Sequence, residues 1–208
     1  MQSTATAPLP AGPERPPSGR RSGRWRPQPS TAVAIAYVSA IFMATMDMHI
    51  VNVALPTLGR AFGAPISDVQ WTVIAYLLTL AVFIPASGWI GDTIGTKRTF
   101  LIALIMFTAA SALCGLAQSL DELVAARALQ GIGGGMLTPT ALAMLYRAYG
   151  PAQRARVART VIVPVLIGPG TAPILGGVLT QTLSWRWGFL VNIPVGVATL
   201  IFSRLRLP

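Results

Sequence analysis

Two ionisable side chains lie inside long apolar stretches of the sequence. Asp47 lies in the stretch 31–55, and Arg127 lies near the start of the stretch 121–146. A charge at the centre of a membrane span costs at least about 2.5 kcal/mol on insertion scales, so each side chain is expected to face a protein interior or a cavity. Two interpretations of Asp47 stay open: a protonatable site that carries a proton or contacts a cation, and a structural acid that only accepts hydrogen bonds.

The two charges are predicted to lie at similar depth. At about 1.5 Å of rise per residue, Asp47 lies roughly 12 Å from the outer end of its span at Leu55. Arg127 lies roughly 9 Å from the outer start of its span at Asp121. Because the two spans run in opposite directions, we expect Asp47 and Arg127 to interact, directly or through water.

The other reactive side chains indicate no enzyme. His49 follows Asp47 by two positions and therefore points to nearly the opposite side of a helix, on one face with Asn52. A packed, hydrogen-bonded neutral histidine is favoured over a proton relay. The sequence has one cysteine, Cys114, and one histidine, which excludes a disulfide framework and a zinc site. HExxH, GxSxG and paired carboxylates are absent, so neither an enzyme nor a cofactor is expected.

Composition places these residues in membrane spans. Of the 208 residues, 53% are hydrophobic and 11% are charged, whereas soluble domains carry about 25% charged residues. A helix of roughly 20 apolar residues crosses the hydrocarbon core of a bilayer. The sequence predicts an all-α polytopic membrane protein with six transmembrane helices, at about residues 31–55, 69–90, 99–118, 121–146, 160–183 and 187–203. Residues 1–30, rich in proline and arginine, are predicted to form a disordered cytoplasmic tail.

Lysine and arginine predict the orientation of the spans. With the tail in the cytoplasm, 13 of the 16 basic residues lie inside, Arg60 and Arg186 lie outside, and Arg127 lies in a span. This asymmetry is typical of a plasma-membrane protein whose two termini are cytoplasmic. The net charge of +10 is thereby assigned to topology and to contact with the lipid bilayer, and nucleic acid is not expected as a partner.

The turn between the second and third spans combines glycine with charge. Gly88 and Gly95 flank Asp92, and Lys97 and Arg98 follow. Gly95 permits a tight bend. The three charged residues are predicted to form an ion-pair latch with a neighbouring helix end. The alternative is a basic loop that only sets topology, which explains neither Asp92 nor the two glycines.

Small residues recur every four positions in two further spans. Gly131 and Gly135 share a stripe with Arg127, and Gly168, Ala172 and Gly176 form a second stripe interleaved with prolines, among them Pro173. Small residues at this spacing let helices approach closely. Tight packing and a deformable, sliding contact are both compatible with the pattern. Ser119 and Glu122 form a predicted capping box at the start of the fourth span.

Five segments, taken together and in order, resemble the major facilitator superfamily, specifically its fourteen-helix drug:proton antiporter branch. They are residues 46–56 (MDMHIVNVALP), 88–98 (GWIGDTIGTKR), 123–133 (LVAARALQGIG), 168–177 (GPGTAPILGG) and 185–196 (WRWGFLVNIPVG). Each segment alone is a weak signal, whereas the ordered set is specific. The sequence departs from the family pattern at His49, where Thr is common, at Thr93 and Thr96, where Arg is frequent, and at Ala172, which replaces a glycine.

The resemblance implies export of lipophilic, often cationic compounds in exchange for protons, driven by the proton gradient without a cofactor. It implies that Asp47 is the protonation or substrate-contact residue and that Arg127 is its proton-transfer partner. The conformational latch would comprise Gly88, Asp92, Gly95, Lys97 and Arg98. The helix packing typical of antiporters would comprise Gly168, Ala172, Pro173, Gly176 and Gly177.

Length is the main departure from the family. Its fold has two six-helix halves, with the substrate site between them. The chain is expected to be the N-terminal half, built from two inverted three-helix repeats, and to act as a truncated or half-length transporter. A second six-helix half or a homodimer partner would complete it. The alternative is a non-transporting membrane remnant or interaction subunit.

Overall fold

The computed structural model describes residues 29–149 and 183–207, together with six isolated positions between 157 and 178. The predicted tail 1–30 lies almost entirely outside the described residues, as does nearly all of the predicted helix 160–183. Of the five residues predicted to pack that helix, only Gly177 is described.

Every described element is an α-helix, as predicted. In chain order they are α1 (Pro29–Phe62), α2 (Ile66–Val69), α3 (Trp71–Ile94), α4 (Thr96–Leu116), α5 (Leu120–Ala148), α7 (Arg186–Leu190) and α8 (Asn192–Arg206). Four segments of the described chain are long and apolar enough to cross a membrane: α1, α2 with α3, α4, and α7 with α8. The 29-residue α5, which carries Arg127 and several glycines, is a further helix of membrane length.

The helices differ in their bounds from the charge-poor stretches that predicted them. The largest difference is in α1, which continues past Pro56 to Phe62. A proline inside a helix removes one backbone hydrogen bond. The following turn is held by Leu58, which is fully buried in a cluster with Leu123 and Phe189. Charge marks where a helix leaves the apolar layer, whereas packing, caps and turns decide where the helix itself ends.

Local chemistry explains two of these ends. Ser119 Oγ accepts a hydrogen bond of 3.2 Å from the Glu122 backbone N–H, and a Glu122 carboxylate oxygen accepts one of 2.8 Å from the Gln118 N–H. The predicted cap of α5 is therefore present. Gly95 is the single residue between α3 and α4, and its φ of 93° lies in the region that favours glycine. The predicted tight bend is confirmed.

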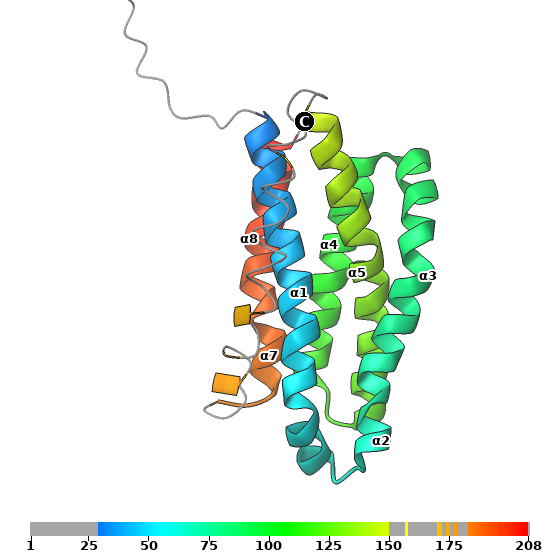
Figure 1. Cartoon of the computed structure of the whole chain (residues 1–208), viewed down its shortest axis with the longest axis vertical. Helices are drawn as coiled ribbons and strands as arrows, with labels where there is room; N and C mark the ends of the chain where they lie inside the picture. The colour runs from blue at the N-terminus through cyan, green and yellow to red at the C-terminus, as the bar shows by residue number, and fades with distance from the viewer. Residues whose placement is uncertain are drawn as a thin grey trace, which may run out of the picture.

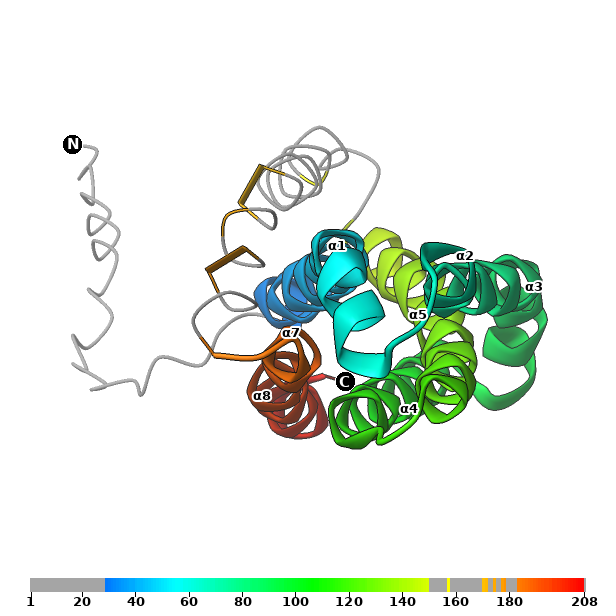
Figure 2. The ribbon, with the colours of Figure 1, turned by 90° about the horizontal axis from the view of Figure 1, so that it is seen from below.

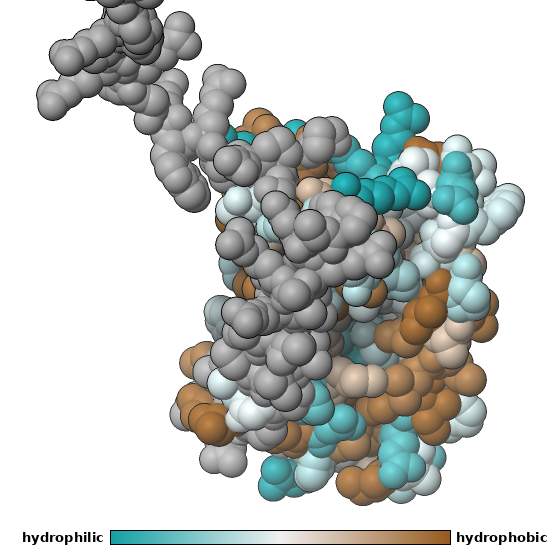
Figure 3. Space-filling view, turned by 45° about the horizontal axis from the view of Figure 1, so that its top comes forward, coloured by the Kyte–Doolittle hydropathy of each residue, from teal (hydrophilic) through white to brown (hydrophobic). Residues whose placement is uncertain are grey.

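The helices form one bundle with α5 near its centre. Helix α5 packs against α3, α4 and α1, and α8 packs against α1 and α4 (Figures 1 and 2). Helix α3 is peripheral: 11% of the span that contains it is buried, against 56% for α1. It exposes Trp71, Leu78, Val82 and Trp89. Apolar residues gather at the lower right of the bundle in Figure 3, as expected for a surface that contacts lipid.

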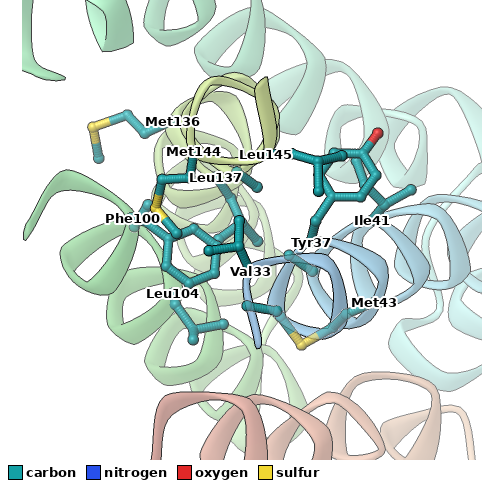
Figure 4. Close-up of a cluster of buried hydrophobic side chains, with 14 of the residues drawn as sticks. Val33, Tyr37, Ile41, Met43, Phe100, Leu104, Met136, Leu137, Met144 and Leu145 are labelled. Carbon is teal, nitrogen blue, oxygen red and sulfur yellow. The ribbon is translucent and has the colours of Figure 1, made fainter. Parts of the chain in front are cut away.

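Two apolar clusters divide the bundle along its length. The larger joins Tyr37 and Ile41 of α1, Phe100 and Leu104 of α4, and Leu137 of α5 (Figure 4). The second cluster, nearer the other end, is built from Val51, Ala54, Leu58, Val69, Cys114, Ala117, Leu123, Ala126, Trp185 and Phe189. The buried polar residues described below fall between these clusters along the helices.

Glycines bring α5 close to its neighbours. A Cβ atom at Gly133 would lie 2.6 Å from the backbone nitrogen of Phe107 in α4, and one at Gly135 would lie 2.8 Å from the Leu80 carbonyl oxygen in α3. A Cβ atom at Gly131 would overlap Thr79 and the Tyr76 carbonyl group. The close packing predicted for Gly131 and Gly135 is confirmed. The stripe faces α3, and Gly133 makes a further contact with α4.

Candidate functional site

The predicted contact between Asp47 and Arg127 is direct. Arg127 Nη1 lies 2.6 Å from Asp47 Oδ2, and the two side chains are 1% and 0% exposed. Asp47 lies midway along α1, and Arg127 lies two turns into α5. An ion pair taken out of water in this way is stable only when both partners stay in place and their remaining polar atoms are bonded.

Helix α3 and two aromatic rings hold the guanidinium of Arg127. Its Nε donates a 3.1 Å hydrogen bond to the Thr72 carbonyl oxygen. Its Cζ lies 4.1 Å from the centre of the Tyr76 ring and 5.8 Å from that of Phe189. Positive charge over an aromatic face is attracted by the ring quadrupole. The orientation of Arg127 is therefore set by three helices besides its own.

Two amides complete the surroundings of Asp47. Its Oδ1 accepts hydrogen bonds from Gln130 Nε2 at 2.8 Å and from Asn192 Nδ2 at 3.1 Å. Gln130 Oε1 in turn accepts a hydrogen bond of 2.7 Å from Arg127 Nη1. Both carboxylate oxygens of Asp47 thus have donors, which is the condition for burying a carboxylate.

Ser111, Gln130 and Asn192 were not predicted as site residues. Each is an uncharged polar side chain inside an apolar span, and all three are buried. Because an unpaired polar group is costly in an apolar layer, such residues are expected to find partners. That signal was available in the sequence, but it does not say which helices bring the partners together.

The predicted latch residues lie at the end of the bundle where α3 turns into α4. Asp92 Oδ1 lies 3.9 Å from Arg147 Nη2 of α5, and Arg147 Nη1 donates a hydrogen bond of 2.7 Å to Thr96 Oγ1. Lys97 Nζ donates 2.6 Å to the carbonyl oxygen of Leu207, directly after α8. These contacts join the α3–α4 turn to the ends of α5 and α8, and Arg147 is a partner that the sequence did not reveal. Their role as a latch stays a prediction.

The other latch residues are less engaged. Arg98 and Gly88 are exposed, and a Cβ atom at Gly88 or Gly95 would meet nothing within 4 Å. Lys97, Arg98 and Arg147 line a cavity of about 450 Å³ together with apolar residues such as Val33 and Met144. A lysine beside the last carbonyl of a helix also interacts favourably with the negative end of its dipole.

We expect Asp92→Asn to change the free energy of unfolding by less than about 1 kcal/mol, because the ion pair is exposed and long. The side chains of Arg147 and Asp92 are 66% and 80% exposed. Denaturant titration of the purified protein in mixed micelles measures this value. A loss of several kcal/mol would mean that Asp92 has partners besides Arg147.

His49 takes no part in the polar site. It is half-buried on α1, and no described residue forms a hydrogen bond with its imidazole. Asn52, predicted on the same face, instead donates 3.1 Å to the Met48 carbonyl oxygen. Cys114 does reach the site, since its Sγ lies 3.4 Å from Gln130 Oε1.

Two solved structures share this fold. A bacterial homolog to the human lysosomal transporter Spinster, in an inward-facing and unoccupied conformation, matches 86% of this chain and 44% of its own with a TM-score of 0.68 and 20% identity. The human organic anion transporter MFSD10 (TETRAN) matches 88% of this chain and 48% of its own with a TM-score of 0.67 and 18% identity.

Sequence comparison identifies the family of this chain. The Multidrug resistance protein B homolog of Mycobacterium tuberculosis (strain ATCC 25618 / H37Rv) is 42% identical over 204 residues. These residues are 97% of this chain and 38% of that relative, so the chain spans well under half of its length. Residues 37–208 match the family described as Major Facilitator Superfamily. The family predicted from the five motifs is therefore confirmed, and the chain belongs to the major facilitator superfamily, whose members are membrane transporters and not enzymes.

Proposed function

We propose that this chain is part of a drug:proton antiporter, which exports lipophilic, cationic compounds across a bacterial plasma membrane in exchange for protons. The buried Asp47–Arg127 ion pair is the observation that carries this function. Among the described residues, Asp47 is the one acid that is fully buried. The relative named as a multidrug resistance protein supports drugs as substrates.

A single carboxylate is sufficient for exchange. The Asp47 carboxylate is negatively charged and is paired with the Arg127 guanidinium. A proton that binds Asp47 removes this negative charge, and a cationic substrate near Asp47 competes with the proton for the carboxylate. Two ligands that compete for one site are exchanged when that site changes sides of the membrane only with one of them bound. Arg127 acts as the internal cation that holds the carboxylate when neither ligand is bound.

The distribution of basic residues supports cytoplasmic termini. Helix α1 begins, and α5 and α8 end, at the same end of the bundle as the α3–α4 turn (Figure 1). These elements carry Lys97, Arg98, Arg147, Arg204 and Arg206. Basic residues accumulate on the cytoplasmic side, where they contact anionic lipid. The lipid bilayer is therefore one partner of the chain. The transported small lipophilic molecule is the other partner that we propose.

A second candidate function is that of a membrane component that does not itself transport. The fold of this family places its substrate site between two six-helix halves, so we propose that transport uses a second six-helix half or a homodimer partner. Without one, the chain would be a non-transporting membrane component that interacts with other proteins. The predicted six helices with their inverted repeat would serve both functions.

Dye efflux separates the two functions. We expect the chain, inserted in an efflux-deficient bacterium, to drive loss of ethidium that stops when a protonophore collapses the proton gradient. Asp47→Asn should abolish this component, because an amide cannot bind and release the proton. The matched control is Asp68→Asn, which removes an exposed carboxylate of α2 and should leave efflux unchanged. Absence of efflux from a well-inserted chain would favour the non-transporting component.

A further inference from the structure

Asp47 and three other side chains form a closed ring of hydrogen bonds. Gln130 Nε2 donates a hydrogen bond of 2.8 Å to Asp47 Oδ1 and one of 3.0 Å to Ser111 Oγ. Asn192 Nδ2 donates a hydrogen bond of 3.1 Å to the same Asp47 oxygen and one of 3.0 Å to the same Ser111 oxygen. The ring therefore passes through two oxygens and two amide nitrogens in alternation, and each member comes from a different helix: α1, α5, α4 and α8.

The hydrogens of the ring can be assigned by counting. Each amide NH₂ group has two hydrogens and donates one to Asp47 and the other to Ser111. Ser111 Oγ accepts from both amides and donates its own hydrogen to the Phe189 carbonyl oxygen at 3.2 Å. Gln130 cannot be flipped, because its Oε1 accepts from Arg127 Nη1 at 2.7 Å. Arg127 thus sets the direction of Gln130.

This arrangement fits a carboxylate and not a carboxylic acid. Asp47 Oδ1 faces two N–H donors, and Asp47 Oδ2 faces the guanidinium of Arg127. A proton on Oδ1 would point at donors and find no acceptor, so at least one of the two amides would have to turn away. Protonation at Oδ1 therefore opens the ring, whereas the charged carboxylate keeps it closed.

Close packing ties Asn192 and Ser111 into one unit. One turn beyond Asn192, a Cβ atom at Gly196 would overlap the side chain of Thr108 in α4. At the other side, a Cβ atom at Gly115 would lie 2.6 Å from Leu190 Cδ2. Helix α4 therefore packs closely against both α7 and α8, and the bond between Asn192 and Asp47 links α8 to α1.

We propose that Asn192 is a positioning residue of the proton site, whose amide holds α8 to Asp47 while the carboxylate is charged and releases it when a proton binds at Oδ1. Ser111 is the second positioning residue, because it fixes the direction of the Asn192 amide. The inference rests on the proposed function only in taking Asp47 as the proton-binding residue. It adds a route by which the arrival of a proton is transmitted to α8.

Infrared titration of the Asp47 carboxyl band in lipid nanodiscs tests the first step, with Asp47→Asn to assign the band. Asn192→Leu keeps similar volume but removes the donor. We expect protonation of Asp47 in this variant at a pH higher by about one to two units, since a hydrogen bond to a charged group is lost. Thr199→Val is the matched control: Thr199 is a buried polar residue of α8 whose hydroxyl donates a hydrogen bond to the Val195 carbonyl oxygen. It should titrate like the wild type.

Ser111→Ala covers the case in which Asn192→Leu does not fold, and it should shift the titration in the same direction by less. Hydrogen–deuterium exchange of residues 192–206 tests the second step. In the wild type, exchange should increase when the pH falls through the Asp47 titration, and in Asn192→Leu it should be fast on both sides. Wild-type titration in both Asn192→Leu and Ser111→Ala overturns the inference. Failure of ethidium efflux with these shifts intact would instead contradict the proposed function alone.

Discussion

Arg127→Ala is expected to lower the free energy of unfolding by about 3–5 kcal/mol, because it leaves a buried carboxylate without its partner. The loss includes the 2.6 Å contact with Asp47, the hydrogen bond to the Thr72 carbonyl oxygen and the contact with the Tyr76 ring. Unfolding of the purified protein by sodium dodecyl sulfate in mixed micelles measures the change. Arg60→Ala is the control, since Arg60 is exposed at the end of α1, and it should stay within about 0.5 kcal/mol of the wild type.

A double-mutant cycle with Asp47→Asn isolates the pair. Asp47→Asn leaves the Arg127 guanidinium buried without a carboxylate, so it is also destabilising on its own. The double variant should be more stable than the sum of the two losses by about 0.5–3 kcal/mol, the range found for residues in one network. Additive losses, in stability and in efflux, would show that Asp47 and Arg127 act independently and would contradict the proposed role of the pair.

Gly133→Ala is the second substitution with a large expected effect. Its Cβ atom would lie 2.6 Å from the Phe107 backbone nitrogen and 2.9 Å from the Phe107 Cα. Backbone atoms cannot turn away as a flexible side chain does, so α4 and α5 must separate. We expect a loss of about 1–3 kcal/mol in the free energy of unfolding, typical of overpacked interiors.

Gly91→Ala provides the matched control for Gly133→Ala. Gly91 is also a buried helical glycine, but a Cβ atom there would meet nothing within 4 Å. Alanine in a helix interior is favoured over glycine by about 1 kcal/mol, so this variant should be as stable as the wild type or more stable. Equal effects of the two substitutions would mean that helix propensity, and not the close approach of α4, governs Gly133.

Much of the local structure follows from the sequence alone. Apolar stretches of membrane length predicted the long helices, Ser119 and Glu122 predicted the start of α5, and Gly95 predicted the turn into α4. The contact between Asp47 and Arg127 was also predictable, because the cost of burying charge leaves few partners and the rise per residue sets their depth. These features depend on one segment at a time, or on depth along a helix axis.

The tertiary structure alone decided which side chains meet around Asp47. Ser111, Gln130 and Asn192 come from three helices, and Asn192 lies 145 residues from Asp47 in the chain. The same holds for Arg147 beside Asp92 and for Lys97 at the end of α8. A helix in lipid is apolar on its outer face as well as its inner face, so periodicity does not reveal which face is buried. Rotation and neighbours are set by the glycine contacts and by the need of each buried polar group for a partner, and both depend on all helices at once.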